Sequence, residues 1–131
     1  MGKYEYEIGG TDNMSNDFVI FRYADILMTR AEALWRLDPA SGEALTLVNQ
    51  VRTRAKVDAF DALTADRLLA ERGREMFGEM TRRQDLIRFG KFGDAWGFKP
   101  AKAESMTKYA IFPIPKQQID INGNLKQNPG Y

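Results

Sequence analysis

Apolar residues recur at three- and four-residue intervals along the first half of the chain, the spacing of helices with one buried face. The pattern predicts a helix over about 22–37 and a second helix over about 42–56. Pro39 disfavours helix immediately before it, and Ser41 follows as a capping residue for the second helix. Two helices joined by so short a turn form an antiparallel hairpin. The residues of the two apolar stripes are Tyr23, Ile26, Leu27, Ala31, Leu34 and Trp35, then Ala44, Leu45, Val48, Val51 and Ala55.

Two further helices are predicted after a short linker. Thr64 is a capping residue for a third helix over about 65–79. A fourth helix is predicted over about 81–89, and Gly90 follows it as a stop signal. The core is therefore expected to be all-α and to consist of two helical hairpins.

The two ends of the chain show other patterns. Residues 3–8 alternate polar and apolar, which predicts a short half-buried strand, and the apolar run 18–21 is predicted to be extended. Residues 110–131 hold three of the five prolines and several turn dipeptides, so an extended tail is predicted there. The expected fold is a single domain over 1–131, with extended irregular arms at its N- and C-terminal ends.

The composition removes several classes of chemistry. The chain has no cysteine and no histidine, which excludes thiol nucleophiles, disulfides, the usual zinc ligand sets and Ser-His-Asp triads. The net charge is +1, so bulk electrostatics give no case for nucleic acid or an anionic membrane. The first ten residues carry no signal-peptide pattern, and no apolar run approaches the length of a membrane span.

The stretch from Leu68 to Gly90 concentrates arginines and acids among apolar residues. Glutamates four residues apart share one side of the third helix, which could place an acid/base pair or ligands for a hard cation there. Interleaved acids and bases favour ion pairs between helices instead, with a partner surface or nucleic acid as further alternatives. We predict a structural ion-pair and hydrogen-bond network that fixes the third and fourth helices and that can extend to the C-terminal tail. Its members are Arg72, Glu75, Glu79, Arg82 and Asp85.

Two tryptophans have different settings. Trp35, on the apolar side of the first helix, is predicted to lie in the core. Trp96 lies in a loop, where an aromatic ring can stack on a sugar or anchor a partner, or can fold back as a lid over the core. With Phe98 and Tyr109 it forms the set of candidate glycan or partner contacts.

The order of motifs resembles the C-terminal region of SusD/RagB-like proteins. The segment "FRYADILMTRAEAL" is similar to the family segment that opens this region on a helix of the tetratricopeptide type, and "GEALTLVNQVRTRA" is similar to the next helix. The segments "PIP" and "QNPGY" resemble the family's ending. The charged stretch matches the family pattern at Glu71, Arg72, Glu75, Glu79, Arg82, Asp85, Leu86, Arg88, Phe89 and Gly90.

Two glycines stand where the sequence departs from the family pattern, and two lie inside the predicted third helix. Gly73 stands where a second basic residue is usual, and Gly123 where a proline is common. Gly73 and Gly78 both fall inside the predicted third helix, where each costs about 1 kcal/mol relative to alanine. Either neighbouring backbone approaches closely there or the helix is locally loose.

The resemblance implies a binding function. It implies tetratricopeptide-like helical hairpins and a non-catalytic, cofactor-free protein that binds glycans or other nutrients beside a SusC-type TonB-dependent transporter. The parent protein is expected on the outer face of the outer membrane. Its lipid anchor, and most of the usual glycan-contacting surface, are expected to lie outside this chain, which is expected to be a soluble fragment. The alternative is a helical-repeat protein–protein interaction module with no sugar site of its own.

Overall fold

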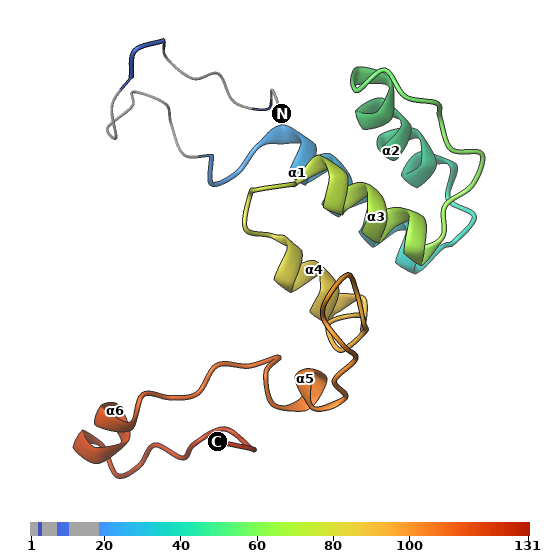
Figure 1. The fold of residues 1–131 in the computed structure, drawn as a ribbon. Coiled ribbons are helices and arrows are strands. Elements are labelled where there is room, and N and C mark those ends of the chain that lie inside the picture. The colour runs from blue at the N-terminus through green and yellow to red at the C-terminus, as the bar shows by residue number, and fades with distance from the viewer. Residues whose placement is uncertain (1–2, 4–7, 11–18) are drawn as a thin grey trace.

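The structure is helical throughout the part of the chain that it describes. The computed structural model describes residues 3, 8–10 and 19–131, with only the backbone at 104 and 105. No strand occurs in these ranges, which confirms the all-α fold class (Figure 1). The helices are α1 (Tyr23–Leu37), α2 (Gly42–Arg54), α3 (Ala65–Glu75), α4 (Arg82–Arg88), α5 (Glu104–Thr107) and α6 (Lys116–Ile121).

Helices α1 and α2 form the predicted antiparallel hairpin. The Ser41 hydroxyl caps α2 by accepting a hydrogen bond from the Ala44 N–H at 3.3 Å. Helix α2 ends at Arg54, two residues before the predicted boundary. Lys56 has a positive φ of 56°, a backbone conformation that cannot continue a right-handed helix.

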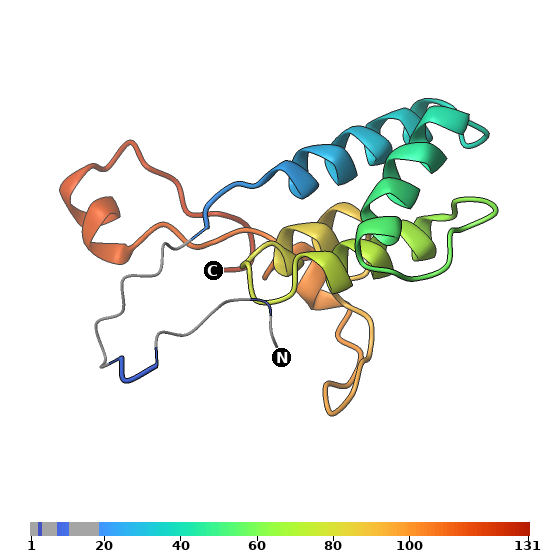
Figure 2. The same cartoon turned by 90° about the horizontal axis from the view of Figure 1, so that it is seen from above.

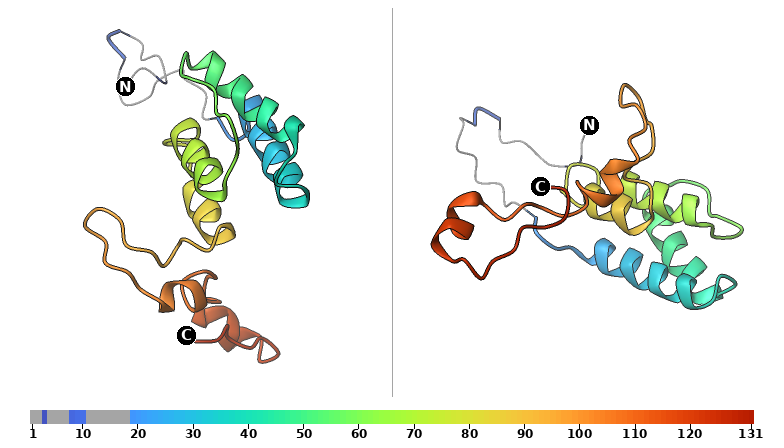
Figure 3. Two further views of the ribbon diagram at one scale, coloured as in Figure 1. Left: turned by 90° about the vertical axis from the view of Figure 1, so that its right-hand side faces the viewer. Right: turned by 90° about the horizontal axis from the view of Figure 1, so that it is seen from below.

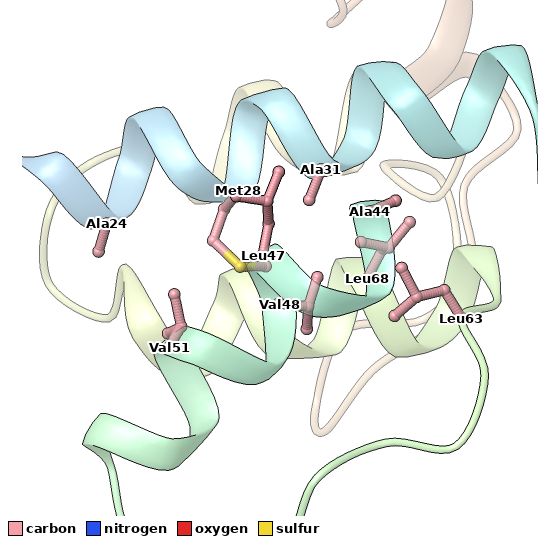
Figure 4. Packing of buried hydrophobic residues seen from close by; sticks show 9 residues of the cluster. All are labelled: Ala24, Met28, Ala31, Ala44, Leu47, Val48, Val51, Leu63 and Leu68. Carbon is pink, nitrogen blue, oxygen red and sulfur yellow. The ribbon is translucent and has the colours of Figure 1, made fainter. Parts of the chain in front are cut away.

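Figure 4 shows the core, which lies between α1, α2 and the start of α3. Alanines on α1 face alanine and valine on α2, and these small side chains let the two helices approach closely. Met28 and Val48 are fully buried. Trp35 is partly buried against this cluster. The buried residues of the cluster are Ala24, Met28, Ala31, Ala44, Leu47, Val48, Val51, Leu63 and Leu68.

Helix α3 is shorter than the sequence predicts. The Thr64 hydroxyl caps it by accepting from the Arg67 N–H at 3.1 Å, but the helix ends at Glu75 rather than at residue 79. Gly78 and Met80 have positive φ values of 78° and 62°, so the chain turns there before α4 begins. The prediction that Gly78 lies inside a helix is therefore wrong, and its left-handed conformation explains why glycine stands there.

The N-terminal predictions fall mostly outside the described residues. Residues 4–7 and 11–18 are not described, so the predicted strand and the start of the predicted extended run are not covered. Ile8, the last residue of that strand, lies in a turn with its side chain fully exposed, so it is not half-buried. Ile20 and Phe21 are also exposed.

The C-terminal arm is not a simple extended tail. It contains the short helix α6, which follows Pro115 in chain order, and α5 lies in the stretch that was expected to be a loop. Pro115 has a φ of −55°, which pre-sets the backbone for the helix that follows. No residue of α6 is buried. This helix therefore has no buried apolar stripe, which is the pattern by which a helix is recognised in a sequence.

The arm folds back and is held by its last residues. The Gln127 side-chain amide accepts from the Ile114 N–H at 2.9 Å and donates to its carbonyl at 2.8 Å. The Tyr131 hydroxyl donates to the Lys108 carbonyl at 3.0 Å. Figures 2 and 3 show this C-terminal arm, drawn in red and containing α6. It lies beside the helical body and not against the α1–α2 hairpin.

Candidate functional site

The charged stretch lies at the meeting point of α1, α3 and α4. Arg72, on α3, is only 4% exposed, and its guanidinium reaches two helices at once. Its Nε donates to Asp85 Oδ1 on α4 at 2.9 Å, and its Nη2 donates to Asp25 Oδ1 on α1 at 3.0 Å. One buried cation therefore joins three helices, because each carboxylate satisfies a different edge of the guanidinium.

A second set of ion pairs joins the N-terminal side of α1 to the end of α3. Arg22, which precedes α1, donates through Nε to both carboxylate oxygens of Glu79, at 2.9 and 2.7 Å. Lys3 also pairs with Glu79, and Arg22 pairs with Glu75. Glu75 in addition accepts from Arg54 at 2.6 Å. Two cations from the N-terminal region thus share one buried carboxylate on the turn after α3.

Sequence analysis did not identify Glu32, a buried carboxylate at the centre of a third group of ion pairs. Glu32 is 4% exposed and accepts from Arg88 at 2.8 Å on each oxygen, and from Arg36 at 2.9 Å. The signal that could have found it is its position, four residues after the fully buried Met28 and on the same face of α1. A charged residue on an apolar stripe needs a buried partner.

Arg82 and the C-terminal tail are reached by different contacts from those of the ion pairs. Arg82, expected in the ion-pair and hydrogen-bond network between the third and fourth helices, joins α4 to α3 by a hydrogen bond: its Nη1 donates to the Leu69 carbonyl at 2.7 Å, where it passes Gly73. The residue that reaches the tail is Arg83, which donates to the Tyr109 carbonyl at 2.7 Å. Among the described residues, the ion pairs of α3 therefore connect it to α1, α2 and α4, and the tail is reached by a hydrogen bond from α4.

The pKa shifts of two of these carboxylates show that they are held in the charged form. Burial raises the pKa of Glu32, but the hydrogen bonds from Arg88 and Arg36 outweigh it, so the pKa lies below the ordinary value of 4.5. Burial likewise raises the pKa of Glu79, and the hydrogen bonds from Arg22 and Lys3 lower it by more. An acid that stays ionised and bound by arginines near neutral pH is unsuited to donate a proton.

Metal binding finds no support in the same carboxylates. Within the described ranges, no group of three or more acidic side chains is arranged to hold an ion. The chemistry of this charged cluster is therefore ion pairing between helices.

None of the described helices is long and apolar enough to cross a bilayer.

One of several open pockets lies beside Trp96, one of the predicted contact residues. It has a volume of about 460 Å³, within the range of small-molecule sites. Leu69 of α3 and Leu86 of α4 supply apolar surface, and the loop after α4 closes one side with Trp96. Trp96 is 61% exposed and is not a lid over the core. The lining residues are Asp66, Leu69, Arg82, Leu86, Lys91, Asp94, Ala95 and Trp96.

The loop that carries Trp96 is held by its own backbone. The Lys102 N–H donates to the Gly93 carbonyl at 2.8 Å, and Trp96 and Lys99 exchange two backbone hydrogen bonds at 3.0 and 2.8 Å. A β-carbon on Gly93 would come within 2.8 Å of the Lys102 carbonyl oxygen, so the closure requires glycine. The Lys99 ammonium also donates to the Asp94 carbonyl at 2.8 Å. These contacts hold the backbone of the loop at Trp96.

The three predicted contact aromatics do not share one site. Phe98 is fully exposed and is not among the described residues that line the Trp96 pocket. Tyr109 lies outside that lining as well, and the Lys108 ammonium lies 5.5 Å from its ring centroid. Of the three, Trp96 is the one that lines this pocket among the described residues.

The sequence is similar to proteins of one family along nearly its whole length. A sequence model of the SusD family, SusD_RagB, matches residues 3–131. The starch-binding protein SusD of Bacteroides thetaiotaomicron is 35% identical in an alignment of 122 positions that covers 88% of this chain and 22% of that protein. The SusD-like protein P2 of Formosa agariphila is 29% identical in an alignment of 133 positions that covers 89% of this chain and 26% of that protein.

Solved structures show the same similarity. A laminarin-binding SusD-like protein matches with a TM-score of 0.70 and 32% identity, over 86% of this chain and 23% of that one. The surface glycan-binding protein A from Bacteroides uniformis matches with a TM-score of 0.69 and 30% identity, over 86% of this chain and 28% of that one. The chain thus spans about a quarter of the length of these relatives.

These matches confirm the resemblance found in the motifs. The family model covers residues 3–131, and the tetratricopeptide-like helices lie where the quoted motifs predicted them. Proteins of this family bind carbohydrate, and they are lipoproteins of the outer-membrane surface. The chain therefore belongs to the SusD family.

Proposed function

We propose that the protein is a non-catalytic glycan-binding component of a SusC/SusD-type uptake system, and that this chain contributes the Trp96 pocket to ligand binding. The observation that carries the proposal is an exposed tryptophan that lines a pocket of about 460 Å³. An indole ring offers a sugar a flat apolar face, and pockets that combine such a face with a few polar groups are the usual ligand sites of proteins.

The names of the relatives support a glycan as the ligand. Two of them are described as starch-binding and laminarin-binding, and a third as a surface glycan-binding protein. Starch and laminarin are polysaccharides, so the ligand class for this chain is a polysaccharide or its fragments. The closure of the loop at Gly93 supports the same proposal, because a loop backbone that is already ordered loses little conformational freedom on binding.

The experiment is a titration of the 131-residue chain with laminarin and starch oligosaccharides by isothermal calorimetry. Trp96→Ala is expected to weaken binding at least about tenfold, because stacking and apolar contact are lost together. Phe98→Ala is the matched control: an exposed aromatic of the same loop, outside the pocket, whose loss is expected to leave affinity unchanged. Equal losses for the two variants, or no saturable binding by the wild type, would contradict the proposal.

The partner we propose is a SusC-type TonB-dependent transporter, with the parent protein tethered by a lipid anchor to the outer face of the outer membrane. The support is membership of the SusD family. Pull-down of a SusC-type transporter by the parent protein tests the pairing. A parent protein that binds glycan but retains no transporter would overturn this part alone.

The proposal also holds that the chain cleaves no glycan. The carboxylates of the charged cluster are engaged by arginines, which leaves none of them free to donate a proton to a glycosidic oxygen. Incubation of the purified chain with laminarin and starch, followed by analysis of the products, tests this statement. Release of shorter sugars would contradict it.

A second candidate function is a protein–protein interaction module without a sugar site. It is favoured by the outward side of α1, where Tyr23, Ile26 and Leu37 are 75%, 56% and 86% exposed. Tyr23→Ser with Ile26→Ser separates the two functions. Loss of transporter retention in this double variant, together with no glycan binding by the wild type, would favour the interaction module.

A further inference from the structure

We infer that Arg83 is a positioning residue that couples the C-terminal arm, residues 109–131, to the loop that carries Trp96. Docking of the arm then raises the affinity of the Trp96 pocket for glycan. The inference rests on the proposed function, because the affinity concerned is that of the same pocket. Arg83 lies on α4, and Figure 1 shows α4 between α3 and the arm.

Arg83 joins the arm to the helical body. Its Nη2 donates to the Tyr109 carbonyl at 2.7 Å and to the Ala110 carbonyl at 3.3 Å. Its guanidinium also lies 4.4 Å from the centre of the Phe112 ring. In the described part of the chain, no other hydrogen bond or ion pair joins α1–α4 to residues 109–131. The polar contacts of the arm with the helices therefore converge on one side chain.

The same guanidinium lies over the ring of Phe92, at the base of the Trp96 loop. It is 5.4 Å from the ring centre, within the range of a cation–π contact. Phe92 is half-buried, and the residues around it in the segment 91–96 supply Trp96 and three further residues of the pocket lining. Arg83 thus contacts the base of the segment that provides half of the described lining.

One guanidinium held between two segments links their stabilities. While the arm is docked, the Phe112 ring and two backbone carbonyls keep the Arg83 guanidinium in place over Phe92. When the arm opens, Arg83 regains its rotamer freedom and Phe92 loses an ordered neighbour. A glycan must then order the base of the loop as it binds, and this cost lowers the affinity.

The first test removes the contact from the side of the arm. Phe112 is 72% exposed and lies outside the pocket lining, so its substitution is not expected to disturb the fold. Phe112→Leu keeps an apolar side chain and removes the ring. We expect the affinity of the 131-residue chain for laminarihexaose, a six-sugar fragment of laminarin, to fall about twofold or more by calorimetry. Phe112→Tyr keeps the ring and is expected to bind within about 1.3-fold of the wild type.

Two further variants show whether the effect passes through Arg83. Arg83→Met keeps the length of the side chain and removes its charge and donors, and we expect affinity to fall about threefold or more. In that background Phe112→Leu is expected to have no further effect, because the shared contact is already gone. Ile121→Ala is the matched control: Ile121 is also an exposed apolar residue of the arm, and its loss is expected to leave affinity unchanged.

A second readout needs no sugar. The Trp96 N–H donates to the Lys99 carbonyl at 3.0 Å, and this bond protects it from exchange with solvent. We expect Phe112→Leu to speed hydrogen exchange at the Trp96 N–H about twofold or more, and Ile121→Ala to leave it unchanged. A contact that stabilised the arm alone would not alter this exchange rate.

The outcomes separate the inference from the proposed function. Wild-type affinity and wild-type Trp96 exchange in Phe112→Leu overturn the inference, while the glycan-binding proposal stands. An effect of Phe112→Leu that persists undiminished in the Arg83→Met background overturns the role of Arg83. Absence of sugar binding by the wild type overturns the proposed function and the effect on affinity, whereas faster Trp96 exchange in Phe112→Leu still supports the coupling of arm and loop. A loss of affinity in Phe112→Leu that the tyrosine variant restores supports both.

Discussion

The guanidinium of Arg82 lies against the backbone of Gly73, at the point in α3 where any other residue would carry a β-carbon. A β-carbon built on Gly73 would come within 2.8 Å of Arg82 Nη1 and 3.1 Å of its Cζ. The same Nη1 donates to the Leu69 carbonyl at 2.7 Å. The bare backbone therefore makes room for Arg82 to cross α3. The sequence left open a neighbouring backbone or a loose helix at Gly73, and the structure instead places a side chain against a regular helix there.

We predict that Gly73→Ala leaves the free energy of unfolding within about 1 kcal/mol of the wild type. Alanine gains about 1 kcal/mol of helix propensity, and displacement of Arg82 from the Leu69 carbonyl costs a similar amount. In an Arg82→Ala background the same substitution is expected to stabilise the fold by about 1 kcal/mol. Urea denaturation of the four proteins measures this coupling.

Gly42→Ala is the control for this cycle. Gly42 is also helical, but no atom lies within 4 Å of the place where its β-carbon would stand. Its effect is expected to be the same with and without Arg82. If Gly73→Ala stabilises the fold equally in both backgrounds, the contact carries no energy and this account of Gly73 is wrong.

The second prediction concerns Glu79, which holds Lys3 and Arg22 together. Glu79→Ala leaves two cations beside a buried position with no carboxylate, and we expect it to lower the free energy of unfolding by about 2–4 kcal/mol. Glycan affinity is expected to stay unchanged, because Glu79 does not line the Trp96 pocket. Thermal denaturation and calorimetric titration measure the two quantities.

Glu43→Ala provides the comparison for Glu79. Glu43 pairs with Arg30 on the surface, where the two side chains are 51% and 63% exposed. Solvent screens such a pair, so the expected change is at most about 0.5 kcal/mol. An unchanged melting temperature for Glu79→Ala, equal to that of Glu43→Ala, would show that the ion pairs at the end of α3 do not stabilise the fold.

The helices were predictable from sequence because their determinants are local. The apolar stripe of α1 and the hydroxyl of Thr64 act within a few residues, so α1 and the start of α3 lie within one residue of the predicted positions. The end of α3 was not predictable, because it depends on the left-handed conformations of Gly78 and Met80. Met80 in particular is a residue that rarely takes a positive φ.

The partners of the charged residues could not be predicted for a different reason. Arg22 and Glu79 are 57 residues apart, and Glu32 and Arg88 are 56 apart, so their pairing depends on how whole helices pack. Spacing along one helix showed which charges share a face, but it gave no information on which helix lies opposite. Spacing therefore placed Arg82 in the network between α3 and α4 without showing that its partner is a backbone carbonyl.

The third prediction is a loss of stability in acid that depends on Glu32 and Glu79. Both have a folded pKa below the ordinary value of 4.5, so as the pH falls the unfolded chain binds protons at these groups first. Their stabilisation is fully present above about pH 5 and is lost as the pH falls from there through the lowered folded pKa values. Urea denaturation from pH 7 to pH 3 measures the decline.

The double variant Glu32→Gln with Glu79→Gln separates these two groups from the remaining acids. It is expected to be less stable than the wild type at pH 7 and to lose less stability between pH 5 and pH 3, because the two protonation sites are gone. Parallel curves for the double variant and the wild type over that range would assign the acid sensitivity to other carboxylates.

The fourth prediction concerns the closure of the Trp96 loop at Gly93. Gly93→Ala forces a β-carbon against the Lys102 carbonyl oxygen, which is backbone and cannot move aside as a flexible side chain can. We expect the loop to open and laminarihexaose affinity to fall about threefold or more, while the melting temperature changes by less than about 2 °C. Gly123→Ala, with open space around its β-carbon position, is expected to change neither quantity. An affinity that survives in Gly93→Ala would show that the pocket does not depend on this closure.

The last prediction concerns the end of the C-terminal arm, where Gln127 holds both backbone groups of Ile114. The Gln127 amide oxygen accepts from the Ile114 N–H, and its nitrogen donates to the Ile114 carbonyl, so one side chain replaces a pair of backbone hydrogen bonds. Gln127→Ala removes both bonds, and each is worth about 1 kcal/mol. Because the arm lies outside the α1–α2 core, we expect local opening rather than global unfolding.

Limited proteolysis measures that opening. Cleavage between residues 112 and 128 is expected to become about tenfold faster or more in Gln127→Ala, since the rate follows the population of the open arm. The melting temperature of the helical core is expected to change by less than about 2 °C. Gln118→Ala is the control, because its side chain lies on the exposed face of α6 and makes no side-chain hydrogen bond within the described residues. Equal cleavage rates for the two variants would show that the arm is held by Tyr131 and Asn128 without help from Gln127.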